Sequence, residues 1–282
     1  MFDLTLEQLK EKQADVTVSE IYHQPSVWEE LAADFFAQEA DYKAFLKAIY
    51  EKHDHVRVIF SGAGTSAFIG DIIAPVLNKQ QLAKVHFEAV ATTDAVSNPE
   101  EYFNPHTPTI LVNFARSGNS PESVATVALG QKIVKDFYQI NITCNKNGKL
   151  AVNSKDDDKA LTLLMPDRSN DKGLAMTSSF SSMIIAAYGL FTDGLLTKEV
   201  AHNLSTIGQE LLDRVSQDIY DVLTFDFNRL VYLGSGALAQ LGHEASLKML
   251  ELTGGQVMAT YESSLGFRHG PKAMLTDQSL IV

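Results

Sequence analysis

Short apolar runs alternate with amphipathic stretches from about residue 56 onward. The runs predict strands at 56–60, 85–91, 109–114, 138–144 and 160–165, and the helical spacing of apolar positions predicts helices at 67–78, 121–136 and 177–194. Apolar strands separated by helices of this length are typical of a parallel sheet covered on both faces. We therefore expect an α/β fold of three layers, αβα, in which the sheet is the middle layer.

The same pattern divides the chain into four parts. Residues 1–52 read as helical, with a plausible start at Ser26 and a second stretch after Asp41. Residues 199–226 form a long amphipathic pattern, after which an apolar run at 230–233 and a helix at 238–252 restart the alternation. The expected parts are a helical segment (1–52), a first domain (53–198), a linking helix (199–228) and a second domain (229–282).

A strand, a Gly-x-Gly loop and a helix occur twice, at 56–66 and at 230–239. Such a loop presents free backbone N–H groups at a helix N-terminus, where anions bind. The spacing from Ile59 to Leu111 is 52 residues and that from Tyr232 to Ile281 is 49. The segment 279–282 thus corresponds to 109–112, so we expect the second domain to be truncated inside a strand.

The two copies differ in the side chains that follow them. Thr65 and Ser66 follow the first loop, and a second polar loop at 115–120 contains Arg116, Ser117, Gly118, Asn119 and Ser120. Hydroxyls at the carboxyl ends of two parallel strands suggest a ligand site, because open α/β sheets bind ligands there. Ordinary helix capping by Ser, Thr and Asn is the alternative.

After the second loop, Glu244, Lys248 and Glu251 share one helical face at offsets of four and three. They are either a surface ion pair or a carboxylate base beside an ammonium group. His269 follows in a loop bounded by Gly270 and Pro271. Zinc is not expected, because no second histidine lies four residues from His243.

A dinucleotide site is a further possibility, because both loops fit the pattern G-x-G-x-x-A. The acidic residue that should follow by about 20 positions is not cleanly placed, since Glu88 lies 26 residues beyond Gly62. A nicotinamide enzyme is therefore a remote alternative.

The composition limits the ligands and the cellular compartment that we expect. A net charge of −12 argues against nucleic acid as the main ligand, although backbone amides bind phosphate without a basic surface. One cysteine, Cys144, fits a reducing compartment. The sequence has neither a secretory signal nor an apolar stretch long enough to span a membrane, so we expect a cytoplasmic protein.

Taken together, these motifs resemble the sugar isomerase (SIS) family, in the family's order. The resemblance rests on the motifs at 61–66, 115–120 and 173–177 and on Glu244-x3-Lys248-x2-Glu251 followed by His269-Gly-Pro271. It covers essentially the whole chain and implies two tandem flavodoxin-like SIS domains. The segment from Glu20 to Trp28 extends it to the branch of galactosamine-6-phosphate deaminases, also called tagatose-6-phosphate ketose/aldose isomerases.

The resemblance also implies roles for single residues. Ser66, Ser117 and Ser120 would hold the phosphate, and we group Thr65, Arg116 and Gly118 with them; Arg116 stands where the related synthase has glutamine. Glu251 would move a proton between C1 and C2, His269 would open the sugar ring, and Lys248 and Glu244 would support the site. Further candidates for substrate contacts are Gly64, Asn119 and Thr177.

The expected activity is isomerisation of 6-phosphorylated hexosamines, with deamination of galactosamine 6-phosphate to tagatose 6-phosphate and ammonia. Neither a metal nor an organic cofactor is implied. In the family the histidine comes from a neighbouring subunit, which implies a homodimer or larger homo-oligomer. A non-catalytic sugar-phosphate-sensing module of the same fold is the main alternative.

Overall fold

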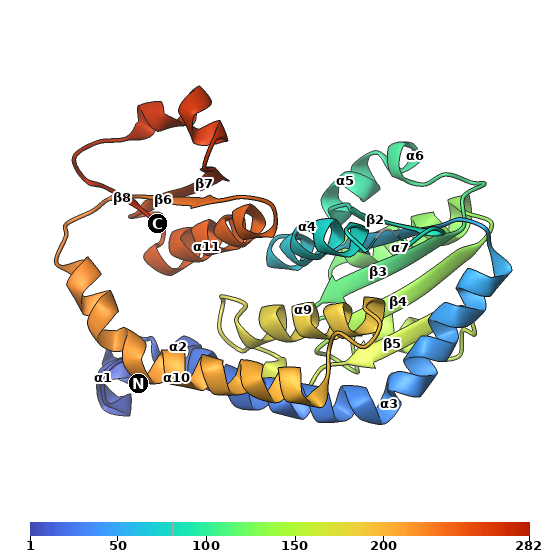
Figure 1. Ribbon diagram of the computed structural model, residues 1–282, viewed down its shortest axis with the longest axis horizontal. Helices are drawn as coiled ribbons and strands as arrows, with labels where there is room; N and C mark the ends of the chain where they lie inside the picture. The colour runs from blue at the N-terminus through green and yellow to red at the C-terminus, as the bar shows by residue number, and fades with distance from the viewer. Residues whose placement is uncertain (81) are drawn as a thin grey trace.

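The computed structural model describes residues 1–80 and 82–282, and its larger sheet has five parallel strands (Figure 1). They are β1 (Val56–Ser61), β2 (Val85–Ala89), β3 (Thr109–Ala115), β4 (Phe137–Thr143) and β5 (Ala160–Leu164). Their order is β2-β1-β3-β4-β5, so the chain runs outward from β1 to β2 and returns to the other side of β1 at β3. This reversal places a topological switch point between β1 and β3, where open α/β sheets bind ligands.

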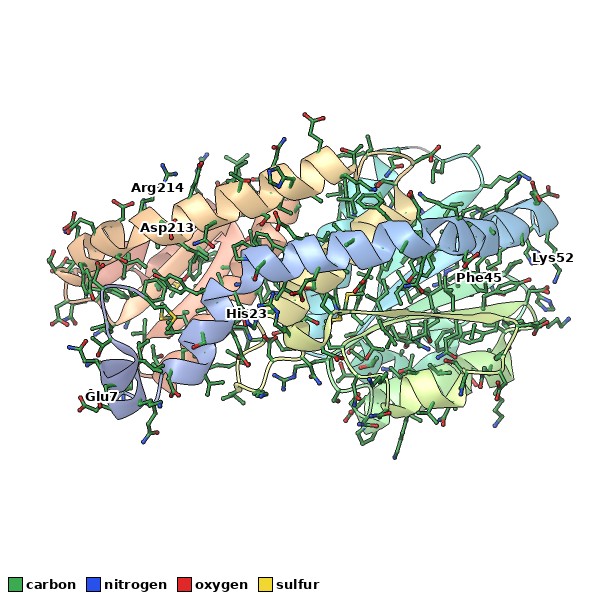
Figure 2. All side chains as sticks on the ribbon, turned by 90° about the horizontal axis from the view of Figure 1, so that it is seen from below. Glu7, His23, Phe45, Lys52, Asp213 and Arg214 are labelled. Atoms are coloured by element: carbon green, nitrogen blue, oxygen red, sulfur yellow. The ribbon has the colours of Figure 1, made fainter. Side chains whose placement is uncertain are left out.

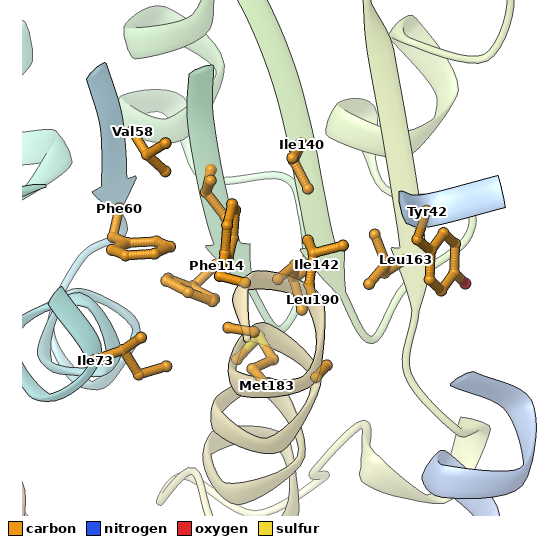
Figure 3. Packing of buried hydrophobic residues seen from close by; sticks show 14 of the residues in the cluster. Tyr42, Val58, Phe60, Ile73, Phe114, Ile140, Ile142, Leu163, Met183 and Leu190 are labelled. Atoms are coloured by element: carbon orange, nitrogen blue, oxygen red, sulfur yellow. The ribbon is translucent and has the colours of Figure 1, made fainter. Parts of the chain in front are cut away.

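Helices cover both faces of this sheet, as expected. One face packs against α3 (Gln24–Lys52), α4 (Thr65–Asn78) and α9 (Ser178–Phe191), and the other against α5 (Thr92–Ser97), α6 (Pro99–Tyr102) and α7 (Pro121–Ile133). Successive strand residues point to opposite faces. Phe60 accordingly packs in the core with residues of α4 and α9 (Figure 3). Ile59 packs on the α7 side.

Three helices form the N-terminal segment, and the third of them, α3, packs against this core. After α1 (Leu6–Glu11) and α2 (Asp15–Tyr22), α3 runs for 29 residues, and α10 (Lys198–Leu223) lies beside it (Figure 2). The expected break in α3 near Asp41 is wrong, because Asp41 lies on the exposed side of a helix whose buried side chains continue from Leu31 to Ile49. Within the described ranges, none of the helices combines the length and apolar character needed to cross a bilayer.

A second, three-stranded parallel sheet follows α10. It consists of β6 (Arg229–Gly234), β7 (Met258–Ser263) and β8 (Ser279–Ile281) in the order β7-β6-β8, with α11 (Ala237–Thr253) packed against β6 and β7. The 3₁₀ turns η2 (Gly266–His269) and η3 (Pro271–Met274) join β7 to β8. The sequence pattern predicted β6, α11 and β8 but not β7.

The two Gly-x-Gly loops share one backbone shape. Gly64 has φ 56° and ψ −132°, and Gly236 has φ 60° and ψ −127°; positive φ favours glycine. A Cβ at Gly62 would lie 2.5 Å from the Ser66 carbonyl carbon, and one at Gly234 would lie 2.5 Å from that of Leu238. In addition, β8 lies beside β6 as β3 lies beside β1. The repeat seen in the sequence is therefore a repeat in backbone geometry.

The polar stretch 145–159 is mostly exposed but includes local structure. It contains the short helix α8 (Lys149–Asn153), in which Leu150 is buried. The buried Asn141 amide donates to the Leu150 carbonyl at 3.0 Å and to Ser154 Oγ at 2.9 Å. A buried amide on β4 therefore anchors this segment, which its polar sequence pattern does not reveal.

Two neighbouring leucines on β5 test the face assignment. Leu163 is 1% exposed and Leu164 is 44% exposed. Leu163→Ala should lower the free energy of unfolding by about 2–5 kcal/mol, because it removes buried methyl groups and leaves a cavity. Leu164→Ala should cost less than about 1 kcal/mol. Urea unfolding of both variants checks this, and equal losses would contradict the described core.

Candidate functional site

The loops after β1 and β3 flank the switch point. The first, at 62–64, leads into α4, whose N-terminus has no side-chain cap among the described contacts. Thr65 and Ser66 open this helix and are 4% and 6% exposed. Ser66 Oγ donates to Met176 Sδ at 3.9 Å. The α4 N-terminus therefore offers backbone amides to an anion beside two nearly buried hydroxyls.

In the second loop, Ser120 and Asn119 bond to backbone amides, and Ser117 is exposed to solvent. Ser120 Oγ accepts from the Ser123 amide at 3.2 Å and is the N-cap of α7. Asn119 Oδ1 accepts from the Lys149 amide at 3.0 Å, while Gly118 adopts a φ of 65°. Ser117 is exposed. The capping alternative thus describes Ser120, whereas Ser117 does not cap the helix.

Arg116 is the cation at this loop. Its NH1 donates to the Gly173 carbonyl at 2.9 Å and to the Leu174 carbonyl at 3.4 Å. Residues 1–198 contain two other arginines, and each is neutralised: Arg57 by Glu88, and Arg168 by Glu30. Across the described residues Arg116 forms no ion pair with a carboxylate, so its charge is available to a ligand.

The segment 171–177 lies against both loops and is fixed by Asp171. This carboxylate, 5% exposed, accepts from the Thr177 hydroxyl at 2.9 Å and from the backbone amides of Thr177, Ser178 and Ser179. The Thr177 hydroxyl is therefore already engaged at the start of α9. Asp171 was not among the candidates predicted from the sequence, although an acidic residue shortly before a Ser-rich helix start is a capping signal.

Glu244, Lys248 and Glu251 share one face of α11 and are called the α11 row below. The first two contact the residue that follows the first loop. Lys248 Nζ lies 2.6 Å from Glu251 Oε2 and 3.3 Å from Glu244 Oε1, and it donates to Thr65 Oγ1 at 2.9 Å. Thr65 Oγ1 in turn donates to Glu244 Oε1 at 3.1 Å. The side chains of Glu244, Lys248 and Glu251 are 5%, 18% and 28% exposed. The surface-pair alternative is therefore wrong.

Glu244 carries the strongest electrostatic perturbation in this cluster. Its Oε2 is buried without a hydrogen-bond partner in the described structure. Burial raises the pKa of this carboxyl to about 7, against the opposing effects of the Lys248 charge and the Thr65 hydrogen bond. Near neutral pH the group therefore both accepts and releases a proton readily.

His243 lies where α11, which packs on the smaller sheet, meets α4, which packs on the larger one. Its ring lies 3.7 Å from that of Phe68 on α4 and 4.1 Å from that of Tyr261 on β7, measured between centroids. Burial lowers the pKa of His243, which favours the neutral ring in this stack. The stack holds α11 against α4, so it supports the alignment of the row with the first loop.

His269 is not part of this cluster. It is exposed, and the segment between β7 and β8 that carries it runs on the side of the smaller sheet away from α11 (Figure 1). The structure thus brings Glu244, Lys248 and Glu251 to Thr65 but leaves His269 apart from them.

Glu88 does not fit the dinucleotide alternative. Arg57 Nε and NH2 donate to its two carboxylate oxygens at 2.6 and 2.8 Å, and these bonds hold the pKa of Glu88 below its ordinary value. The carboxylate is therefore engaged and poorly placed to bind a ribose. Within 1–80 and 82–282, no group of three or more His, Cys, Asp or Glu side chains is arranged to hold a metal ion.

Comparisons with known proteins identify the family. A model of the SIS domain family matches residues 51–192. D-galactosamine-6-phosphate deaminase AgaS of Escherichia coli is 42% identical over 267 residues, which make up 94% of this chain and 69% of that protein. The deaminase of the same name from Shewanella sp. (strain ANA-3) is 38% identical over 280 residues, or 99% of this chain and 71% of that protein.

The structural match is equally extensive. The crystal structure of tagatose-6-phosphate ketose/aldose isomerase from Escherichia coli aligns with a TM-score of 0.88 at 40% identity, covering 93% of this chain and 71% of that one. The family match and the identity to these relatives lead to one conclusion. The chain belongs to the SIS domain family, and it is an enzyme.

Proposed function

We propose that this protein isomerises 6-phosphorylated hexosamines and deaminates galactosamine 6-phosphate to tagatose 6-phosphate and ammonia. The observation that carries the proposal is the contact between Lys248 and Thr65, with Nζ and Oγ1 2.9 Å apart. It joins the partly buried acid–base row on α11 to the N-terminal end of α4, where an anion would bind. The names of the relatives at 38–42% identity supply the substrate class.

The phosphate would bind between the two loops at the switch point. The α4 N-terminus supplies backbone amides with Thr65 and Ser66 beside them. Arg116 supplies the free positive charge, and Ser117 an exposed hydroxyl. Gly118, with its positive φ, lets the backbone approach an anion closely. Ser120 would contribute mainly by fixing α7, and Gly64, Asn119 and Thr177 by shaping the loops.

Glu251 would be the proton-transfer base. It is the most exposed carboxylate of the row, and the Lys248 ammonium lies 2.6 Å from it. In the open-chain aldehyde, Glu251 removes the C2 proton and returns a proton to C1. The resulting 2-imino ketose takes up water, its C–N bond breaks, and ammonia leaves with tagatose 6-phosphate as the other product. A positioned carboxylate is the group this transfer requires.

Glu244 and Lys248 would keep that base in its working state. Glu244 shares the Lys248 ammonium with Glu251, at 3.3 and 2.6 Å. Protonation of Glu244 near pH 7 removes one of the two negative charges beside Lys248, and the electrostatic environment of Glu251 changes with it. His269, which lies away from the row, would open the sugar ring in a site completed by a second copy of the chain.

The domain organisation follows from the repeat. We propose that 53–198 and 229–282 are two SIS domains, joined by a linking helix at 199–228 and preceded by a helical segment at 1–52. The matched loop geometry at Gly64 and Gly236 supports this division.

Replacing the proposed base tests the function directly. Glu251→Gln keeps the side chain's size but cannot accept the C2 proton, so ammonia release from galactosamine 6-phosphate should fall by about 10²-fold or more. Binding of galactitol 6-phosphate, which has no carbonyl and cannot react, should remain within a few-fold of that of the unaltered chain. A coupled ammonia assay and titration calorimetry measure the two quantities.

The matched control is Glu210→Gln, on the exposed face of α10, which should leave both quantities unchanged. Ammonia release at the original rate from the Glu251→Gln variant would rule out Glu251 as the base. Isomerisation without ammonia from any amino sugar would replace the deaminase with a plain ketose/aldose isomerase.

The pKa of Glu244 predicts how stability depends on pH. The folded pKa of about 7 exceeds the ordinary value of 4.5, so between these values the folded chain retains a proton that the unfolded chain has lost. The contribution of Glu244 to stability should therefore fall as pH rises from about 4.5 to 7 and then level off. The unfolding free energy of the unaltered chain minus that of Glu244→Gln, measured by urea unfolding across this range, should therefore fall as pH rises. A rise of this quantity with pH would contradict the assignment.

A further inference from the structure

One side chain connects the N-terminal helices to the phosphate loops. Glu20, near the end of α2, is 7% exposed. Its carboxylate accepts from the Lys172 amide at 2.6 Å and from the Gly173 amide at 3.3 Å. These contacts join positions more than 150 residues apart in sequence. Glu20 thereby fixes the segment that lies against both loops.

The same segment orients Arg116. Gly173 donates its N–H to Glu20 and offers its carbonyl to Arg116 NH1 at 2.9 Å. We propose that Glu20 is a positioning residue, which holds Arg116 in the orientation that binds the 6-phosphate of the substrate. This inference rests on the proposed function, in which Arg116 contacts the phosphate.

The contact between Glu20 and Gly173 leaves little room for a side chain at position 173. A Cβ on Gly173 would lie 2.9 Å from Glu20 Oε2 and 2.9 Å from Thr17 Oγ1. Ser178 Oγ also donates to the Glu20 carbonyl at 2.9 Å, and Asp171 ties the following residues to the start of α9. The carbonyls that face Arg116 are therefore fixed from two directions.

An indirect link preserves the arginine's charge. Arg57 and Arg168 bind carboxylates directly, at 2.6 Å in each case, and an ion pair of this kind neutralises the guanidinium. Around Arg116 the backbone of Gly173 stands between the acid and the cation, with its N–H on Glu20 and its carbonyl on Arg116. The carbonyl therefore orients the guanidinium without neutralising it, and the charge remains open to a phosphate.

A double-mutant cycle between Glu20 and Arg116 tests this. Calorimetry with galactitol 6-phosphate should show about a 10- to 100-fold loss of affinity for Arg116→Ala, because a charged hydrogen-bond donor is removed. Glu20→Ala should weaken binding about tenfold. In the Arg116→Ala background, Glu20→Ala should cause no further loss, because contacts that act through one another are not additive.

Two controls separate positioning from general stability. Asp15→Asn removes the same charge from α2 and should leave affinity unchanged. Binding of galactitol, which lacks the phosphate, should not respond to Glu20→Ala. If that variant fails to fold, Glu20→Gln, with similar volume and one remaining acceptor, and Gly173→Ala, whose methyl would displace the segment, should show the same coupling to Arg116→Ala.

The outcomes distinguish a failure of the positioning role of Glu20 from a failure of the proposed function. If Arg116→Ala weakens binding but the Glu20 and Gly173 variants do not, or if their losses add to that of Arg116→Ala, the positioning role is wrong and the proposed function stands. If Arg116→Ala leaves the affinity unchanged, both the positioning role and the proposed phosphate site are wrong.

Discussion

The Glu244 carboxylate is buried between helices that belong to different sheets, where it accepts a hydrogen bond from Thr65 and lies 3.3 Å from Lys248. A buried charge needs its partners, since removing one of them leaves an uncompensated group in a low dielectric. Thr65 is the first residue of α4, directly after the Gly-x-Gly loop. The pairing therefore fixes α11 over the N-terminal end of α4, and the position of Glu251 relative to the two loops depends on it.

Three parts of the chain that are distant in sequence build the site, and each is held by buried polar contacts. The loops after β1 and β3 gain their places from the parallel sheet, α11 from Glu244 and the His243 stack, and the segment 171–177 from Glu20 and Asp171. Side chains locked on rigid elements retain the geometry that proton transfer demands. The free charge of Arg116 and the near-neutral pKa of Glu244 are the two chemical consequences.

Periodicity predicted the five-stranded sheet and the row on α11, because both depend on local patterns of apolar residues. It missed β7, in which Met258 is 46% exposed and apolar and polar residues are mixed. Periodicity could not predict the Glu20–Gly173 contact, for another reason. The partner of Glu20 is a backbone amide 153 residues away, and a backbone group leaves no mark in the sequence. The separation of His269 from the α11 row likewise depends on which side of the smaller sheet its segment runs.

The central claim is that the loops at the switch point and the α11 row form one site for a 6-phosphorylated sugar. A crystal structure of the chain with galactitol 6-phosphate tests it most directly. The account predicts that the phosphate lies between the α4 N-terminus and Ser117, within hydrogen-bond distance of Arg116, with C1 and C2 of the sugar chain next to Glu251. A phosphate bound elsewhere, or a sugar chain directed away from Glu251, would contradict it.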